Sequence, residues 1–252
     1  MSSQDQSETR SPFTRPGFLV AAVLVVAIVV VGVVVGILNA TRAEDDPPRT
    51  SPTTAAPTPS ATTASPTDEP TADESVCGLE PGDSEGTLSS APETEWHFQG
   101  TTAYPTSPTY GPGATDENGV RYCFQHSPEG ALFAAANAVV QGSDAETSTD
   151  WINYFLSEDS PERDQLLDDV AAGSPSSLRM TVAGFRLLNF DGDSANVDMA
   201  VEAVGGGNST YASAVYDLVW EAGDWKLLPQ DIDNPLRMAE IPDISGYVTW
   251  TE

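Results

Sequence analysis

The longest apolar run of the chain is Phe18–Leu38, FLVAAVLVVAIVVVGVVVGIL, which contains no charged and no strongly polar residue. At ~1.5 Å rise per residue, a helix of this length spans ~31 Å, which matches the hydrocarbon core of a bilayer. A cleaved signal peptide is the alternative, but its apolar core is usually ~7–15 residues, and Leu38–Ala40 fits a cleavage site poorly. The pattern therefore predicts one uncleaved transmembrane helix at 18–38, preceded by a short tail at 1–17.

A polar stretch follows the predicted span. Residues 39–76 are dominated by Pro, Thr, Ser and Ala, and from Ala43 to Val76 there is no aromatic residue, no Leu and no Ile. Such a segment buries too little apolar surface to offset its chain entropy, so we expect it to be disordered. Its prolines favour extended geometry with a reach on the order of 100 Å, at ~3.1 Å per residue. We interpret 39–76 as a spacer, although an ordinary cytoplasmic linker has the same composition.

Apolar and aromatic residues return in 77–252, which has a normal length for one domain with its own core and contains all five tryptophans. Its first part, 77–126, is rich in Gly and Pro and is expected to be an irregular arm. Trp96, Tyr104 and Tyr110 are the side chains expected to hold this arm against the body.

Helix signals begin at Ser127-Pro128-Glu129, where Ser suits the N-cap, Pro the first turn and Glu the positive end of the helix dipole. The GALFAAANAVV that follows is apolar nearly all round, which predicts a buried helix. A second helix is expected around Asp150–Leu156, and a third from Ser160-Pro161-Glu162 to Gly173.

After these helices the period changes to that of strands. Four segments are rich in β-branched and aromatic residues: Leu178–Phe190, Ala195–Val204, Tyr211–Glu221 and Trp225–Leu228. Turn signals separate them at Asp191-Gly192-Asp193 and Ala222-Gly223-Asp224. Helices followed by antiparallel strands predict an α+β domain in which the helices pack on one curved sheet.

The chain has two cysteines, Cys77 and Cys123, on the same side of the predicted span. A disulfide between them would pin the arm to the body and contribute ~4 kcal/mol in the chain-entropy model. Two independent buried thiols are the alternative. The flanks of the span tie in arginines, so they do not orient it. Because disulfides persist outside the cytosol, the spacer and cysteines favour a cytoplasmic N-terminus and an extracytoplasmic C-terminal domain at the cell membrane.

The net charge is −28, from 38 acidic and 10 basic residues. Such a field repels phosphate backbones, so direct binding of nucleic acid is not expected. Metal and cofactor sites are not expected either, because His97 and His126 are the only histidines and a metal site needs more ligands that converge. Asp191-Gly192-Asp193 departs from the calcium-loop pattern and predicts a turn, and Gly205–Gly207 lacks the lysine of a phosphate-binding loop.

No nucleophile motif or catalytic residue set is recognisable. An interior carboxylate of raised pKa beside a tyrosine would suit proton abstraction, which makes Asp198, Tyr211, Tyr216 and Asp217 the candidates on the predicted strands. The alternative is that Asp198 and Asp217 face water.

The order of helices and strands, closing with VWEAGDWKL at 219–227, resembles the nuclear-transport-factor-2-like (NTF2-like) fold. This resemblance implies a cone in which a bent sheet wraps long helices over 127–252.

A second resemblance is carried by Gly119–Val139, GVRYCFQHSPEGALFAAANAV, together with Cys77-Gly78-Leu79. These residues are similar to a family of membrane-anchored actinobacterial proteins of integrative conjugative elements. The resemblance implies an uncharacterised single-pass protein of a type IV secretion-like machine. By architecture alone it is similar to the VirB8 and TcpC components of conjugation machines.

Three functions follow as hypotheses. The first is a non-enzymatic membrane-anchored scaffold or assembly protein of a conjugative or type IV secretion-like envelope machine, with other envelope proteins as partners. The alternatives are a cell-surface module that binds or senses a small ligand, and a cone-fold enzyme using a pocket Asp or Tyr. Gly32 and Gly36 have the spacing of a helix-dimer motif, so self-association into a homo-oligomer is a further expectation.

Overall fold

The structure is a computed structural model that describes residues 74–172, 179–205, 208–231 and 233–252. The predicted span at 18–38 and nearly all of the predicted spacer lie outside this part of the chain. Within it, no helix has both the length and the apolar character needed to cross a bilayer.

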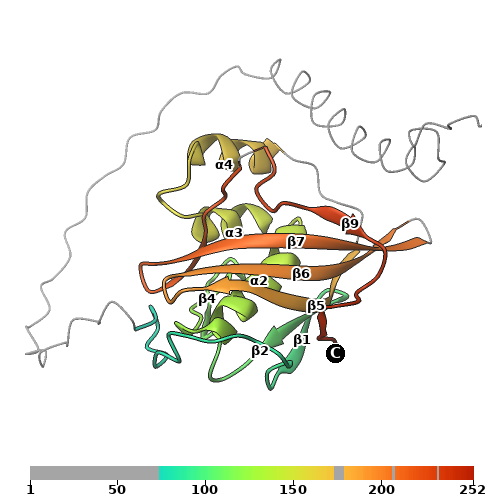
Figure 1. Cartoon of the computed structure of the whole chain (residues 1–252). Coiled ribbons are helices and arrows are strands. Elements are labelled where there is room, and N and C mark those ends of the chain that lie inside the picture. The colour runs from blue at the N-terminus through green and yellow to red at the C-terminus, as the bar shows by residue number, and fades with distance from the viewer. Residues whose placement is uncertain (1–73, 173–178, 206–207, 232) are drawn as a thin grey trace, which may run out of the picture. The chain divides into compact units, whose positions relative to one another are not determined.

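The described part of the domain is built on an antiparallel sheet with the strand order β10-β5-β6-β7-β8, and β9 pairs with β7 as well (Figure 1). The strands are β5 (Arg179–Phe190), β6 (Ser194–Gly205), β7 (Asn208–Glu221), β8 (Asp224–Leu227), β9 (Ala239–Ile241) and β10 (Val248–Thr249). The first four match the segments predicted from the hydrophobic pattern. The class predicted from the sequence, α+β, is therefore confirmed.

Helix α2 (Pro128–Ser143) lies on one face of this sheet and contacts β5, β6 and β8 (Figure 1). It begins as predicted, because Ser127 is the N-cap and its Oγ accepts a hydrogen bond of 3.0 Å from Gly130 N. Gly130 is required there, since a Cβ would lie 1.9 Å from Gln125 O. The helix is buried nearly all round, as its apolar sequence indicates.

The other predicted helices are also present. Helix α3 (Ser148–Phe155) buries Trp151, Ile152 and Phe155, and helix α4 (Arg163–Ala172) buries Leu166. The sequence pattern places the start of the third helix at Ser160-Pro161-Glu162, and helix α4 begins directly after it, at Arg163. Its predicted end, Gly173, lies outside the described residues.

The turn between β7 and β8 explains their tight pairing. Ala222 and Gly223 have φ of 54° and 79°, and Glu221 pairs with Asp224 across them. Two residues of positive φ between paired strands are the mark of the hairpin turn that matches strand twist. The predicted turn at Asp191 is confirmed too, because Asp191 Oδ1 accepts hydrogen bonds from Ser194 N and Ser194 Oγ at 2.9 and 2.8 Å.

The region 77–126, expected to be an irregular arm, contains more regular structure than its composition indicates. Its strands are β1 (Glu95–Gln99), β2 (Thr102–Thr106), β3 (Ala114–Thr115) and β4 (Arg121–Tyr122), which pair as β1-β2 and β3-β4. Short strands among glycines and prolines leave little periodicity to detect. Two expected anchors are confirmed, since Trp96 packs on Trp250 and Tyr110 on Phe133, with ring centroids 5.5 and 5.7 Å apart.

The folded domain also begins slightly before Cys77. Ser75 is buried, and Val76 N donates a 2.8 Å hydrogen bond to Gly223 O in the β7–β8 turn. These two residues, assigned to the spacer from composition, contact the body of the domain.

The core lies between α2 and the sheet. Along β6 the buried apolar residues Ala195, Val197, Met199 and Val201 alternate with residues of the opposite face, as expected for a strand. We call the face that contacts α2 the inner face, and the opposite one, which carries Asp198, the outer face.

Candidate functional site

The outer face carries a set of buried polar side chains that the hydrophobic pattern does not reveal. The side chains of Asp198 on β6 and Asp217 on β7 are 2 and 5 % exposed, and both belong to ion pairs. Both carboxylates were candidates from the sequence. The alternative that they face water is wrong.

Asp198 is fully engaged with neighbouring groups. Its Oδ2 accepts hydrogen bonds from Arg186 Nε at 3.1 Å and from the Tyr247 hydroxyl at 3.0 Å, and its Oδ1 accepts from Ser213 Oγ at 2.6 Å. Arg186 also lies over the Tyr247 ring, 4.1 Å from its centroid. This network joins β5, β6 and β7 to the segment before β10, so its role is to hold that segment on the sheet.

Asp217 is only half engaged. Its Oδ1 accepts hydrogen bonds from Arg237 Nη2 and Asn196 Nδ2. Its Oδ2 is buried and has no hydrogen-bond partner among the described residues. A buried acceptor without a partner costs ~1–3 kcal/mol, so this oxygen is the least satisfied carboxylate atom of the outer face.

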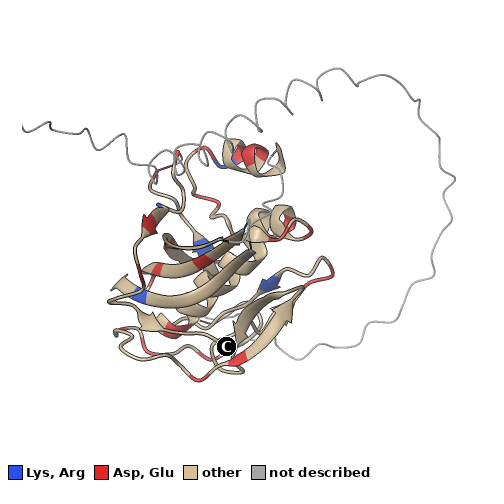
Figure 2. Ribbon diagram, turned by 90° about the vertical axis from the view of Figure 1, so that its right-hand side faces the viewer, with Lys and Arg blue, Asp and Glu red and all other residues tan. Residues whose placement is uncertain are grey.

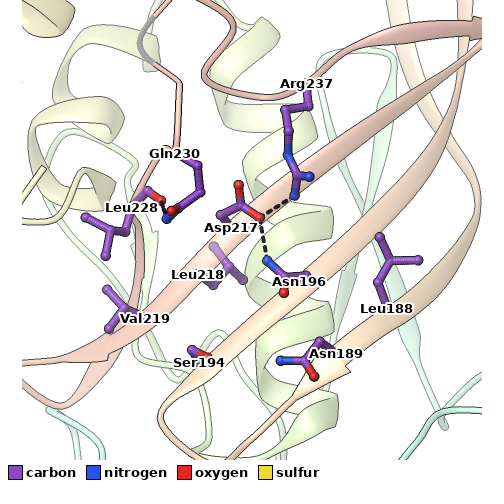
Figure 3. A pocket seen from close by; sticks show the side chains of 10 residues that line it. All are labelled: Leu188, Asn189, Ser194, Asn196, Asp217, Leu218, Val219, Leu228, Gln230 and Arg237. Carbon is purple, nitrogen blue, oxygen red and sulfur yellow. Dashed lines mark hydrogen bonds and ion pairs between the residues drawn. The ribbon is translucent and has the colours of Figure 1, made fainter. Parts of the chain in front are cut away.

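A hollow of about 570 Å³ lies over Asp217. In Figure 3 the side chains of Asp217 and Asn196 lie in front of the strands, with a helix behind them. The lining combines polar and apolar residues: Leu188, Asn189, Ser194, Asn196, Asp217, Leu218, Val219, Leu228, Gln230 and Arg237. Its volume falls within the ~300–1,000 Å³ typical of small-molecule sites.

The groups of this hollow suit hydrogen bonding. Arg237 compensates the charge of Asp217 while its own side chain stays 44 % exposed. Side-chain amides on three segments of the chain, Asn189, Asn196 and Gln230, add further donors and acceptors. Together they present a polar, nearly charge-balanced surface, and the unpaired Oδ2 of Asp217 is buried beneath it.

The two tyrosine candidates do not join this site. Tyr216 lies on the inner face, 3 % exposed within the core, and burial raises the pKa of its hydroxyl well above the ordinary value. Tyr211 lies on the β9 side of β7, where it pairs with Ile241. Neither lines the hollow beside Asp217.

The two histidines lie apart in distinct surroundings. His126 stacks on Trp220 with ring centroids 4.1 Å apart, and its Nε2 lies 3.0 Å from Gly192 O. His97 is half exposed on β1 beside Tyr104. Within the described ranges there is no group of three His, Cys, Asp or Glu residues that could hold a metal ion.

Cys77 and Cys123 form a disulfide, as predicted. Asp224, the first residue of β8, is fully buried behind it. Its carboxylate accepts hydrogen bonds from Cys123 N at 2.7 Å and Phe124 N at 2.9 Å, and from the Tyr154 hydroxyl at 2.7 Å. Burial raises the pKa of Asp224, and these hydrogen bonds oppose that rise. The carboxylate therefore fixes the bridged loop to the sheet.

Two further buried cations brace the domain. Lys226 Nζ lies 3.2 Å from the Tyr154 ring centroid and donates to Tyr154 O, and burial lowers the pKa of the amine to about 8. Arg121 contacts the Tyr104 ring and donates to Asn137 Oδ1 at 2.7 Å, and burial lowers its pKa to about 10. Both bind elements of the fold together and neither lines the hollow.

Acidic side chains predominate over basic ones across the described domain. Figure 2 shows acidic positions on strands, helices and loops, with few basic ones between them.

Three residues of the hollow, Arg237, Asn196 and Gln230, were not predicted from the sequence, because their spacing carries no motif. The detectable signal was an isolated arginine in a polar, Pro-rich stretch after the last predicted strand.

These features define an α+β domain with a six-stranded antiparallel sheet, two short strand pairs, a disulfide at its N-terminal end and a polar hollow on the outer face of the main sheet. A family model described as "Domain of unknown function (DUF8175)" matches residues 55–249, so the chain belongs to this family. No curated protein and no solved structure matches the chain.

Proposed function

We propose that this chain is a non-enzymatic, membrane-anchored scaffold of a conjugative or type IV secretion-like envelope machine. A helix at 18–38 anchors it, the segment 39–76 gives it reach, and the domain makes protein contacts outside the cytoplasm. The carrying observation is the Cys77–Cys123 disulfide, which lies where the spacer meets the domain.

The disulfide supports the proposal in two ways. It belongs to an oxidising compartment, which agrees with a domain on the outer side of the membrane. It also transmits a force applied to the spacer to the sheet, because the backbone N–H of Cys123 donates a hydrogen bond to Asp224 of β8. Gly113 leaves room for the bridge, since a Cβ there would lie 2.6 Å from Cys77 Sγ.

The packing of the inner face favours a role in protein–protein contacts rather than the binding of a ligand inside the fold. Large side chains occupy the space between α2 and the sheet, with Phe133, Phe185 and Trp225 fully buried. A core filled this way presents binding partners with a stable outer surface. We further propose that the domain is an NTF2-like cone, which the helix-then-sheet order and the bulges in β5 support.

The first experiment is a crosslinking pull-down from membranes of a cell that carries the chain with its mobile element. The full chain bears a C-terminal tag, and the control is a tagged 1–76 chain that keeps the tail, span and spacer. We expect proteins of the transfer machine with the full chain only. Recovery of the same proteins with both chains, or a transfer frequency unchanged by deletion of the gene, would contradict the scaffold role.

Topology is tested separately by trapping thiols in intact cells with a membrane-permeant maleimide before lysis. The oxidised bridge predicts that Cys77 and Cys123 stay unlabelled until a reductant is added. Labelling of both cysteines without reductant would place the domain in the cytosol and overturn the proposed localisation.

A further inference from the structure

The hollow over Asp217 has the character of a binding site that the scaffold role does not use. One wall is β7 with Asp217, a second is β5 and β6, and the third is the chain after β8, which brings in Gln230 and Arg237 (Figure 3). Asp217 is 95 % buried, yet its Oδ2 has no partner within the described chain. A ligand that donates an N–H or O–H to this oxygen would remove the cost of leaving it unpaired.

The lining narrows the chemistry of the ligand. Asp217 supplies the acceptor, while Arg237 and the amides of Asn189 and Gln230 supply donors within the same hollow. The ligand must therefore carry donors and acceptors close together. Leu188, Val219 and Leu228 add apolar surface beside these polar groups. This mixture of polar and apolar lining suits a molecule that carries hydroxyl groups on a carbon ring.

Two other classes of ligand, anions and metal cations, do not fit the hollow. An anion would meet the field of a chain with 38 acidic and 10 basic residues, and the carboxylate of Asp217 in the hollow itself would repel it. A metal cation would need several hard ligands, but Asp217 is the only carboxylate among the lining residues described. A neutral, hydroxyl-rich ligand meets neither difficulty.

We propose that this hollow binds a neutral saccharide, with one sugar oxygen accepting from Arg237 and a neighbouring hydroxyl donating to Asp217 Oδ2, which is covered in the free chain and is reached when the ligand displaces the side chains over it. The site is separate from the scaffold function, since it lies on the outer face and neither Cys77 nor Cys123 lines it. Either proposal can fail alone.

The test is saturation-transfer NMR on the full chain in phosphocholine nanodiscs, because sugar-headed detergents would compete for the site. Maltose and N,N′-diacetylchitobiose are the probes, at up to ~10 mM, well above the ~1 mM Kd of a weak site. We expect at least one to bind. Binding of both identifies the hydroxyls as the recognised groups, and binding of chitobiose alone adds the acetamide. A pull-down on insoluble cell-wall glycan then separates a polymer ligand from a free sugar.

The decisive variant is Asp217→Asn, which keeps the shape of the side chain and replaces an acceptor with a donor or weaker acceptor. We expect its affinity to fall about tenfold or more, the usual effect of losing a hydrogen bond to a charged group. The matched control is Asp198→Asn, another buried carboxylate paired with an arginine on the same face but outside the hollow. The control is expected to keep its affinity.

A third variant covers the outcome that Asp217→Asn does not fold. Asn189→Ala changes an exposed amide at the rim and is expected to weaken binding severalfold without altering the fold. The proposal is overturned if neither disaccharide binds the wild-type chain. It is also overturned if Asp198→Asn weakens binding as much as Asp217→Asn, or if neither Asp217→Asn nor Asn189→Ala weakens it.

Discussion

The two faces of the sheet are stabilised by different physical means. The inner face is closed by apolar side chains from α2 and the strands, such as Phe133, Phe185 and Met199, all at 0 % exposure. The outer face is held by charge, with Asp198 and Asp217 paired to Arg186 and Arg237. Apolar packing depends on area and volume, whereas the ion pairs depend on individual atoms finding partners. The outer face is therefore the one where a single unsatisfied atom can mark a site.

The same comparison holds within the outer face. Among the described residues, Asp198 has partners on both oxygens, and Asp217 has them on one. A fully engaged carboxylate rigidifies the fold, because every lone pair that points inward is used. A half-engaged carboxylate keeps an acceptor without a described partner. Burial alone therefore does not distinguish an acid that stabilises the fold from one that is left partly unpaired.

The largest expected effect comes from the inner face. Phe133→Ala should lower the free energy of unfolding by about 3–5 kcal/mol, because it removes a fully buried ring and leaves a cavity. Its counterpart, Leu188→Ala, truncates a side chain that is 52 % exposed on the outer face and should change stability by less than about 0.5 kcal/mol. Urea denaturation followed by tryptophan fluorescence measures both. Similar losses for the two variants would break the contrast between the faces.

A smaller effect separates the two carboxylates. Asp198→Ala should cost about 2–3 kcal/mol, because Ser213 and Tyr247 lose a shared acceptor. Asp217→Ala should cost about 1 kcal/mol, since the same change also removes an oxygen that was already unsatisfied. The same denaturation experiment compares them. A larger loss for Asp217 than for Asp198 would show that Oδ2 has a partner in solution.

A pH effect tests the edge of the sheet, where Lys226 of β8 meets α3. Its pKa is about 8 in the folded chain against 10.5 for an ordinary lysine, so the unfolded chain binds more protons between these values. Stability from this residue therefore rises with pH through that window and is lost as the pH falls through about 8. The stability of wild type relative to Lys226→Met should increase by ~2 kcal/mol between about pH 7 and pH 10.

Comparison with Lys226→Met at each pH removes the contribution of the other groups that titrate in alkali. A difference that stays flat over the window would mean that the amine remains charged in the fold. The charges of Asp224, Glu221 and Glu158, which raise the pKa of Lys226, would then outweigh burial.

The smallest expected effect is that of one hydroxyl. Tyr247→Phe removes a donor to Asp198 and should cost about 1 kcal/mol. Tyr211→Phe is the control, since no hydrogen bond of its hydroxyl occurs within the described residues, and it should be neutral. Thermal unfolding of the two variants in parallel measures the difference. Equal melting temperatures would mean that Arg186 and Ser213 alone satisfy Asp198.

Much of the architecture was predictable because it rests on local signals. The N-cap at Ser127, the alternation along β6 and the turn at Ala222-Gly223 each depend on a few neighbouring residues. The short strands of the 77–126 region and the two strands after Arg237 were not predicted. They are only two to five residues long and their stability comes from their partners.

The candidate site was predicted only in part. Asp198 and Asp217 were named from their strands, but their partners were not, because Tyr247 lies 49 residues from Asp198 in the chain and Arg237 lies 20 from Asp217. Their roles depend on which groups the fold brings to them. Tyr216, also named, lies on the opposite face from Asp217, because adjacent residues of a strand point to opposite sides.

The α+β class, the buried helix, the main strands and the two cysteines available for a bridge could all be inferred from the amino-acid sequence, because propensity and periodicity act over short stretches. The packed structure was needed to show that Asp224 holds the bridged loop from 101 residues away, and that one buried oxygen of Asp217, beside a hollow, has no partner among the described residues. Those outcomes depend on contacts between segments distant in the chain, and the burial that makes an unpaired charge costly exists only once the segments have packed.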